Sequence, residues 1–333
     1  MAAERLGLGL SLALAWTLVQ AAPASPQAIH VTGYGSVEFL SQQGSKATFD
    51  AHNLNLILVG KLRNHLFAAA EVEYEHGGEE IALEFAYLAF TRIRYLNLIA
   101  GKFIVPFGSF NVNHPAFINK VPGRPFGFDR VIPVTYNDVG VMVRGGLPTG
   151  RLTRVTYDAW AVNGLAGDPG GDLRGMRDNN IDVDGSKFFG GRLGFVGPHG
   201  FDIGASVHTG VYNDENDLRV TLFGVDATFQ HSGFELKGEF VQANQQTTAE
   251  DLKKRGFYGQ ASYLATTWFE PTVRFSQMDF PGESNRDLRE VSLGASFYPS
   301  DFGALRIFYR VNKERSVTEV KDNLFIAQFT VGF

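Results

Sequence analysis

The sequence contains no cysteine among its 333 residues and only three tryptophans. For an exported protein, the missing cysteine excludes a disulfide framework as a source of stability. The formal net charge is a modest −5, which argues against non-specific binding to nucleic acid. After the N-terminal segment the chain also lacks any apolar run long enough to cross a bilayer as a helix, so we expect no helical span.

The N-terminal segment has the features of a secretory signal peptide. Arg5 precedes an uncharged, leucine-rich run from Leu6 to Val19, and Ala22 and Ala24 supply small residues at the cleavage spacing. A short membrane anchor is the alternative, but the run is too short to span a bilayer comfortably. We therefore predict that residues 1–24 are a signal peptide and that residues 25–333 form the mature domain.

Helical periodicity is scarce after Ser25, and strand-like alternation of apolar and polar residues runs through most of the chain. The apolar side of these predicted strands carries no charged residue and many alanines and glycines, whereas the other side carries charges along whole strands. A soluble sandwich would instead bury large, close-packed side chains on its inner face. The pattern favours a barrel with lipid outside and water inside.

The alternation also assigns a face to each side chain. It places Glu71, Glu73, Glu75 and Glu84 inward, together with Asn53 and Asn55. The predicted outward, lipid-facing set includes His52, Leu54, Leu56, Leu58, Ile81, Leu83, Phe85, Tyr87, Ala89, Ile93, Val141 and Leu293.

The connectors alternate between short and long. Residues 63–64, 148–151 and 197–200 are short, whereas residues 41–49, 106–133 and 163–187 are long. Short turns at one end and long loops at the other are typical of outer-membrane barrels, with the short turns in the periplasm and the long loops outside the cell. The fold class predicted is all-β: a closed, antiparallel transmembrane β-barrel of about sixteen strands, with fourteen as the alternative.

Closure of the barrel explains the C-terminal pattern. Phe325, Ala327, Phe329, Val331 and Phe333 share one apolar face of the last predicted strand. Because lipid cannot hydrogen-bond a free strand edge, this strand is expected to pair with the first strand near Ile29. An ordinary closing strand in a soluble barrel is the alternative.

Residues 101–145 form the most distinctive segment of the chain. They include Gly101-Lys102-Phe103, the Pro106-Phe107-Gly108 turn, Asn111, His114-Pro115, Arg124-Pro125, Pro133 and Asp138-Val139-Gly140. This segment resembles the phosphate-selective porin O and P family. The resemblance implies a sixteen-stranded homotrimeric porin in the outer membrane of a Gram-negative-type bacterium, without a cofactor. It also implies that the third long loop folds into the lumen.

The composition of that loop agrees with a functional role. Five prolines between residues 106 and 133 stiffen it, and a long ordered loop in a compact domain is usually functional. A loop that only caps the barrel is the alternative. No Asp or Glu occurs from Phe85 to Phe128.

We therefore predict a basic constriction that concentrates anions. Its pore-lining residues would be Arg92, Arg94, Lys102, His114, Lys120, Arg124, Arg130, Arg144, Arg274, Arg306 and Arg310. The inward glutamates weigh against strict phosphate specificity. Salt bridges that fix the shape of the barrel are an equally good interpretation of the same basic residues.

Residues 178–185 contain a weak candidate for calcium binding. Asn180, Asp182 and Asp184 stand at alternate positions before Gly185, and oxygen ligands at that spacing can wrap the ion. The acidic residue expected later is replaced by Gly191. Turns built on Asn and Asp side chains are the preferred interpretation.

The predicted function is a porin. Its water-filled channel would pass small hydrophilic solutes or ions with a mild preference for anions, and its partners would be outer-membrane lipid and these solutes. The alternatives are a non-channel barrel, either adhesin or structural, and an outer-membrane enzyme. Neither His231-Ser232 nor His208-Thr209 supplies a recognisable Ser–His–acid set, so an enzyme is disfavoured.

Overall fold

The computed structural model describes residues 29–177, 179–183, 185–280, 287–314 and 320–333. The predicted signal peptide, residues 1–24, lies outside the described residues. None of the helices in the described part is long and apolar enough to cross a membrane. The helical segments in these ranges are three short 3₁₀ turns, namely η1 (His76–Gly78), η2 (Asn111–Asn113) and η3 (Phe128–Arg130).

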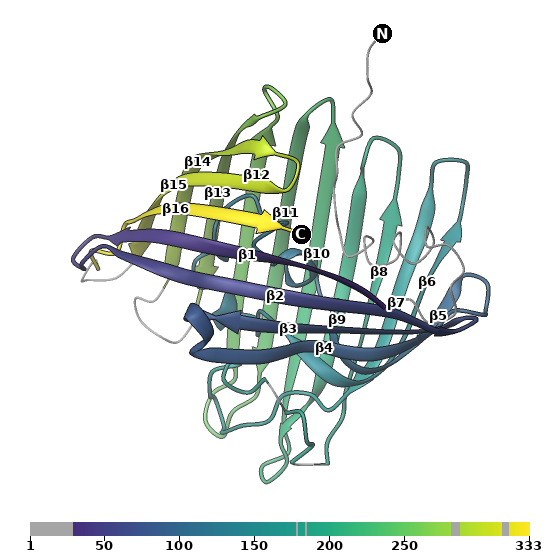
Figure 1. Cartoon of the computed structure of the whole chain (residues 1–333). Helices are drawn as coiled ribbons and strands as arrows, with labels where there is room; N and C mark the ends of the chain where they lie inside the picture. Colours follow the sequence, from purple (N-terminus) through teal and green to yellow (C-terminus); the bar gives the residue numbers. More distant parts are fainter. Residues whose placement is uncertain (1–28, 178, 184, 281–286, 315–319) are drawn as a thin grey trace.

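Sixteen antiparallel strands form one closed barrel (Figure 1). Each strand pairs with its neighbours in the chain, and the first pairs with the last, so the predicted sixteen-stranded barrel is confirmed. The strands are β1 (Ile29–Gln42), β2 (Thr48–Arg63), β3 (Leu66–Glu75), β4 (Glu80–Phe90), β5 (Leu96–Ile104), β6 (Asn137–Pro148), β7 (Arg154–Val162), β8 (Phe188–Val196), β9 (Asp202–Asn213), β10 (Leu218–His231), β11 (Phe234–Gln245), β12 (Leu252–Tyr263), β13 (Phe269–Asp279), β14 (Leu288–Ser300), β15 (Gly303–Glu314) and β16 (Leu324–Gly332).

The closing seam lies between β1 and β16. The ladder runs from Tyr34 opposite Gly332 to Gln42 opposite Leu324. Past its end, Gly33 and Phe333 exchange two backbone hydrogen bonds, of 3.0 and 3.1 Å. The strand with the apolar C-terminal pattern is therefore held by closure of the sheet, as expected.

The outer face of the barrel is apolar. Val141 and Leu293 are 57 % and 56 % exposed, and other outward residues with large exposed apolar side chains are Val31, Val37, Leu54, Leu58, Leu83, Leu88, Leu98, Leu193, Val207, Val225, Leu236 and Phe329. Exposed aromatic side chains gather near the short turns: Tyr95, Phe201, Phe234, Tyr263, Trp268 and Phe302. An apolar belt edged by aromatic residues is what a lipid-embedded barrel requires.

Two β-bulges overturn part of the predicted inward and outward pattern. Between β1 and β2 the register shifts after Ser36, and His52 turns into the lumen, within 4 Å of Glu38. Between β3 and β4 the register shifts at Glu71, so Phe85, Tyr87 and Ala89 face inward rather than toward lipid. A bulge inserts one extra residue, which reverses the parity of everything beyond it.

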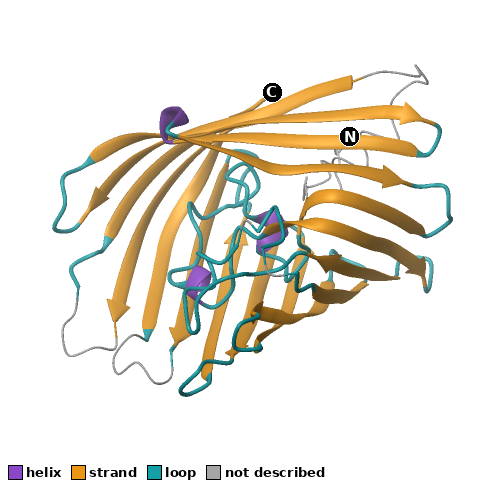
Figure 2. Cartoon of the chain, turned by 90° about the horizontal axis from the view of Figure 1, so that it is seen from below, coloured by secondary structure: helices purple, strands orange, loops and turns teal. Residues whose placement is uncertain are grey.

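Two connectors differ from the sequence prediction. The first loop is only residues 43–47, because β1 and β2 extend further than expected. Strand β4 ends at Phe90, so Arg92 and Arg94 lie in the exposed turn 91–95 and not on the barrel wall. The third long loop, residues 105–136, enters the barrel, and Figure 2 shows loop and short helical turns gathered inside the ring of strands. The predicted lumenal loop is therefore confirmed.

We expect Gly33→Ala to impair barrel closure. A methyl group at Gly33 would lie 2.2 Å from the Asn55 carbonyl oxygen and 2.7 Å from the Phe333 ring. The matched control is Gly35→Ala, whose methyl group would have its nearest neighbour at 3.4 Å. The measurement is the fraction of refolded protein that migrates as a heat-modifiable barrel. Equal fractions for the two variants would contradict the role assigned to Gly33.

The outer face can be tested by placing a charge on it. Val141→Arg should cost about 2–4 kcal/mol if the residue lies near the bilayer midplane, because lipid cannot solvate the guanidinium. The control is Ala82→Arg, since Ala82 lies opposite Glu73 and lines the lumenal cavity described below. Unfolding titrations in bilayers give both values, and similar penalties at the two positions would refute the assignment of faces.

Candidate functional site

The two ends of the lumenal loop, residues 105–136, are hydrogen-bonded to each other where the loop leaves and re-enters the wall. The Val105 N–H donates to the Tyr136 carbonyl at 3.0 Å. The buried Asn111 amide donates to the carbonyls of both residues, at 2.7 and 2.8 Å, and its oxygen accepts from the Tyr136 N–H at 2.7 Å. One side chain thus ties both ends of the loop together.

One side of the lumenal loop packs against the wall through apolar side chains. The rings of Phe110 and Phe128 meet Tyr258 of β12 edge to face, with centroids 5.8 and 5.7 Å apart. Around them the loop residues Val131, Ile132 and Val134 are buried with the wall residues Tyr212, Leu218, Val220, Leu222, Val241, Ala243, Met278 and Leu288. The expectation of a wet interior is therefore wrong for this side of the barrel.

The wall also supplies acceptors for the backbone of the lumenal loop. Glu239 of β11 accepts hydrogen bonds from the N–H groups of Ser109 and Phe110, at 3.1 and 2.7 Å. Glu290 of β14 accepts one from the Phe126 N–H at 2.8 Å. Both glutamates are buried, so each replaces water as the partner of a donor that the loop brings into the barrel.

Three inward arginines supply the donors. Arg274 of β13 reaches the carbonyls of Gly123 and Arg124 at 3.1 and 3.2 Å. On β15, Arg306 lies 3.4 Å from the Phe117 carbonyl, and Arg310 lies 2.8 Å from the Pro122 carbonyl. The Arg274 guanidinium also pairs with the Glu290 carboxylate at 2.9 Å.

Arg274, Arg306 and Arg310 therefore hold the loop. Arg274 and Arg306 are 1 % and 2 % exposed, because the loop covers them. The alternation places them inward, but inward is not the same as facing water. They cannot meet a passing solute as the sequence-based interpretation requires.

Lys120 is also an anchor. Its ammonium group pairs with Glu270 of β13 at 2.6 Å and with Glu235 of β11 at 3.2 Å. It lies 3.2 Å from the Ser262 hydroxyl as well. Two carboxylates from the wall thus neutralise the one lysine at the tip of the loop.

A cavity of about 260 Å³ remains between the other side of the loop and strands β2–β5. Its lining carries charges of both signs. The barrel side presents the acidic residues Glu73, Glu75, Glu80 and Glu84 together with His52, and the basic residues of the lining are Lys102, Arg124, Arg174 and Arg177. Such charges set a strong local field in a narrow space of low dielectric.

Arg124 is the centre of the basic group. Its side chain lies 3.6 Å from Asp129, which also binds Arg174 at 2.8 Å. Burial and then the nearby Arg174 lower the pKa of Arg124 from its ordinary value, although arginine stays charged near neutral pH. Arg177 approaches from the fourth long connector and donates to the Thr135 carbonyl at 3.0 Å.

The other predicted pore residues are spread over the molecule. Lys102, His114 and Arg124 line the cavity, but burial lowers the pKa of His114, so its ring is neutral near pH 7. Arg130 is exposed at the end of η3 and lies outside the cavity lining. Arg144 pairs with Asp158 near the short-turn end. It is five residues along β6 from the partner of Lys102, or roughly 17 Å of strand.

Sequence reasoning missed several residues of this cavity. Arg174 and Arg177 come from the connector 163–187, where two arginines three positions apart were a usable signal. Glu80 is the first residue of β4 and directly precedes its apolar part. The sequence pattern places His52 on the outer face, because alternation cannot reveal the bulge that turns it inward.

The calcium candidate has ordinary turn chemistry in its described part. Asp182 accepts a hydrogen bond from the Gly185 N–H at 2.8 Å and pairs with Lys187. The Asn180 backbone carbonyl lies 3.5 Å from the Asn163 amide. Asp184 lies outside the described residues.

We expect Arg274→Met to loosen the lumenal loop. It leaves two loop carbonyls without this donor and the buried Glu290 without its closest cation, at a cost of about 3–5 kcal/mol. The readouts are unfolding in denaturant and the rate of tryptic cleavage after Lys120. Arg92→Met, in the exposed turn, serves as control. The anchoring role would be wrong if both readouts matched the native protein.

Comparisons with known proteins agree with this architecture. The chain is similar in fold to OmpF of Salmonella typhi, with a TM-score of 0.67, 14 % identity and coverage of 92 % of this chain and 98 % of that one. An anion-selective porin from Comamonas acidovorans has a TM-score of 0.65 and 11 % identity, over 92 % and 100 % of the two chains. The outer-membrane channel DcaP of Acinetobacter baumannii has a TM-score of 0.62 and 13 % identity, over 93 % and 99 %.

The sequence itself is similar to one curated protein and to one family model. An uncharacterised protein of Aquifex aeolicus (strain VF5) is 28 % identical over 244 residues, which cover 68 % of this chain. The chain spans about half the length of that relative, 54 %. The model of the family described as phosphate-selective porin O and P matches residues 202–324. This match covers less than half of the chain and agrees with the resemblance seen in residues 101–145, so the chain is similar to the phosphate-selective porin O and P family and has the fold of the porins named above.

Proposed function

We propose that this barrel is a porin through which small hydrophilic solutes and ions diffuse passively across the outer membrane. The observation that supports it is the polar cavity beside the lumenal loop, lined by charges of both signs inside a closed barrel with an apolar outer face. The anchored loop narrows the lumen, because one of its sides is packed dry against β9–β14. The passage therefore runs along β2–β5, beside the lumenal loop.

We infer that selectivity is weak and leans toward anions. Four glutamates and four basic side chains line the cavity, so their fields largely cancel for a small ion. A single charge about 4 Å from a passing ion contributes about 4 kcal/mol at an effective dielectric near 20. Arg124 and Arg174 share the Asp129 carboxylate, which leaves one net positive charge among these three groups as the local attraction for an anion. Strict phosphate specificity does not follow from such a balanced lining.

We further propose that the chain assembles as a homotrimer in outer-membrane lipid. One of its structural relatives is OmpT of Vibrio cholerae in a trimer form, with a TM-score of 0.63 at 10 % identity. The apolar outer face provides the surface for both lipid and neighbouring copies. A trimer would insert three channels at once.

The alternatives have less support. For an enzyme, His208 is the most buried candidate base. Its ring nitrogens are engaged by Trp160, which donates to Nδ1 at 3.0 Å, and by the Tyr136 hydroxyl, 3.2 Å from Nε2. His231 packs against the ring of His199 at a short turn. A purely structural or adhesive barrel does not require charges of both signs around a lumenal cavity.

Planar-bilayer recording tests the channel and its selectivity together. The native protein should give stepwise conductance, closing in three steps if it is trimeric. Arg124→Gln combined with Arg174→Gln removes two positive charges from the cavity, so the reversal potential under a salt gradient should shift toward cations.

The matched control is Arg92→Gln combined with Arg94→Gln, which removes the same charge from the exposed turn. It should leave the reversal potential unchanged. Absence of conductance from correctly folded protein would refute the porin proposal. Equal shifts for the two double variants would refute the assignment of the cavity as the selective passage.

A further inference from the structure

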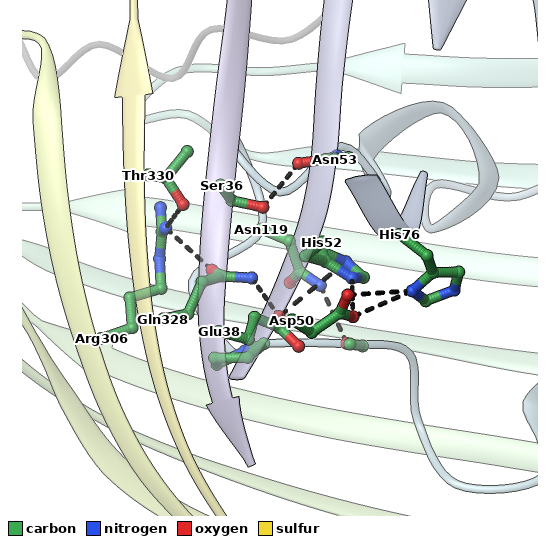
Figure 3. A network of polar contacts seen from close by, with 12 residues as sticks. Ser36, Glu38, Asp50, His52, Asn53, His76, Asn119, Arg306, Gln328 and Thr330 are labelled. Atoms are coloured by element: carbon green, nitrogen blue, oxygen red, sulfur yellow. Dashed lines mark hydrogen bonds and ion pairs between the residues drawn. The ribbon is translucent and has the colours of Figure 1, made fainter. Parts of the chain in front are cut away.

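A cluster of carboxylates and imidazoles lies in the lumen near the long-loop end of β1 and β2 (Figure 3). One ligand atom from each of Glu38, Asp50 and His52 lies within 4.8 Å of the others. The His52 Nε2 is 3.8 Å from Glu38, and its Nδ1 is 3.7 Å from Asp50. The β-bulge that turns His52 away from lipid is what brings these three side chains together.

A second histidine completes the group. His76 belongs to η1, the turn between β3 and β4, and its Nδ1 lies 3.0 and 3.1 Å from the two oxygens of Asp50. The rings of His52 and His76 are 6.3 Å apart, on the two sides of the Asp50 carboxylate (Figure 3). The elements β1, β2 and η1 thus each contribute a side chain to the cluster.

The charge of the cluster is unbalanced. Within the described residues, the ion pairs of Glu38 and Asp50 are made to histidine alone. Histidine is mostly neutral at pH 7, so two carboxylates face each other without a permanent cation.

We propose that Glu38, Asp50 and His52, with His76 as the fourth ligand, bind a divalent transition-metal ion of the Zn²⁺ type. Two imidazoles and two carboxylates are the nitrogen and oxygen donors that Zn²⁺ accepts in tetrahedral sites. Tetrahedral ligand atoms lie roughly 3.3 Å apart around this ion, whereas one ligand atom from each of Glu38, Asp50 and His52 lies within 4.8 Å of the others. Binding would therefore draw these atoms together by up to about 1.5 Å, and His76, whose Nδ1 contacts Asp50, would turn toward the ion. Soft thiolate ligands are absent from the whole chain.

Hydrogen bonds from neighbouring side chains hold the Glu38 carboxylate in place. The amide of Gln328 on β16 donates to the Glu38 carboxylate at 2.7 Å. The amide oxygen of Gln328 in turn accepts from Arg306 at 3.1 Å (Figure 3). Hydrogen bonds of this kind orient metal ligands, and they link this site to an arginine that also anchors the lumenal loop.

The test is calorimetric titration of Zn²⁺ into the full-length barrel in detergent, which reads binding without any solute flux. The native protein should bind one saturable equivalent per chain. His52→Gln and Asp50→Asn should each weaken binding at least tenfold, as should His76→Gln if it is the fourth ligand. His30→Gln, at the opposite end of β1, is the control and should bind as the native protein does. Heat-modifiable migration confirms that every variant is folded.

Two results would overturn the proposal. One is the absence of saturable Zn²⁺ binding by the native protein, which would leave the cluster as histidine–carboxylate pairs only. The other is unchanged affinity in both His52→Gln and Asp50→Asn. That result would place the ion elsewhere, for example at His199 and His231, whose rings are 4.7 Å apart at the short-turn end.

Discussion

A long loop can enter a barrel only if its backbone finds new hydrogen-bond partners there. Water satisfies the N–H and C=O groups of a surface loop, but residues 105–136 lie where the wall excludes much of it. Buried charged side chains of the wall supply these partners. Glu239 and Glu290 accept hydrogen bonds from N–H groups of the loop. Arg274, Arg306 and Arg310 donate to its carbonyls. Charged partners make the stronger hydrogen bonds that this arrangement needs. The narrowing of the lumen depends on them.

This anchoring divides the inside of the barrel into two unlike parts. Along β9–β14 the loop and wall form a dry core of aromatic and branched side chains, as in a soluble protein. Along β2–β5 the same loop presents Arg124 to a row of glutamates across a cavity. One segment thus serves as a packing surface on one side and as a polar wall on the other.

Much of this could be predicted from the sequence, because a period of two residues is directly visible in it. Strand number, closure of β1 on β16 and entry of the third loop all follow from alternation, connector length and the resemblance around Gly101–Gly145. The wrong face assignments also have physical causes. A bulge adds one residue without any change in composition, so His52 and Phe85 were given the wrong face. Alternation assigns Arg274 and Arg306 inward, but only the folded loop decides whether an inward arginine meets water or a carbonyl.

The seam between β1 and β16 has a consequence for how the barrel forms. Thr32 and Phe333 are 301 positions apart, yet the Thr32 hydroxyl donates to the Phe333 carbonyl at 2.6 Å. All other neighbouring strands are consecutive in the chain, so the segments that form their ladders are much closer in sequence. The seam forms only when the two ends of the chain meet, and contacts between residues so far apart in sequence are slow to form. Until then β1 and β16 both expose unpaired edges, which are templates for pairing with other chains. The interval before closure is therefore the stage at which this protein is most prone to aggregate.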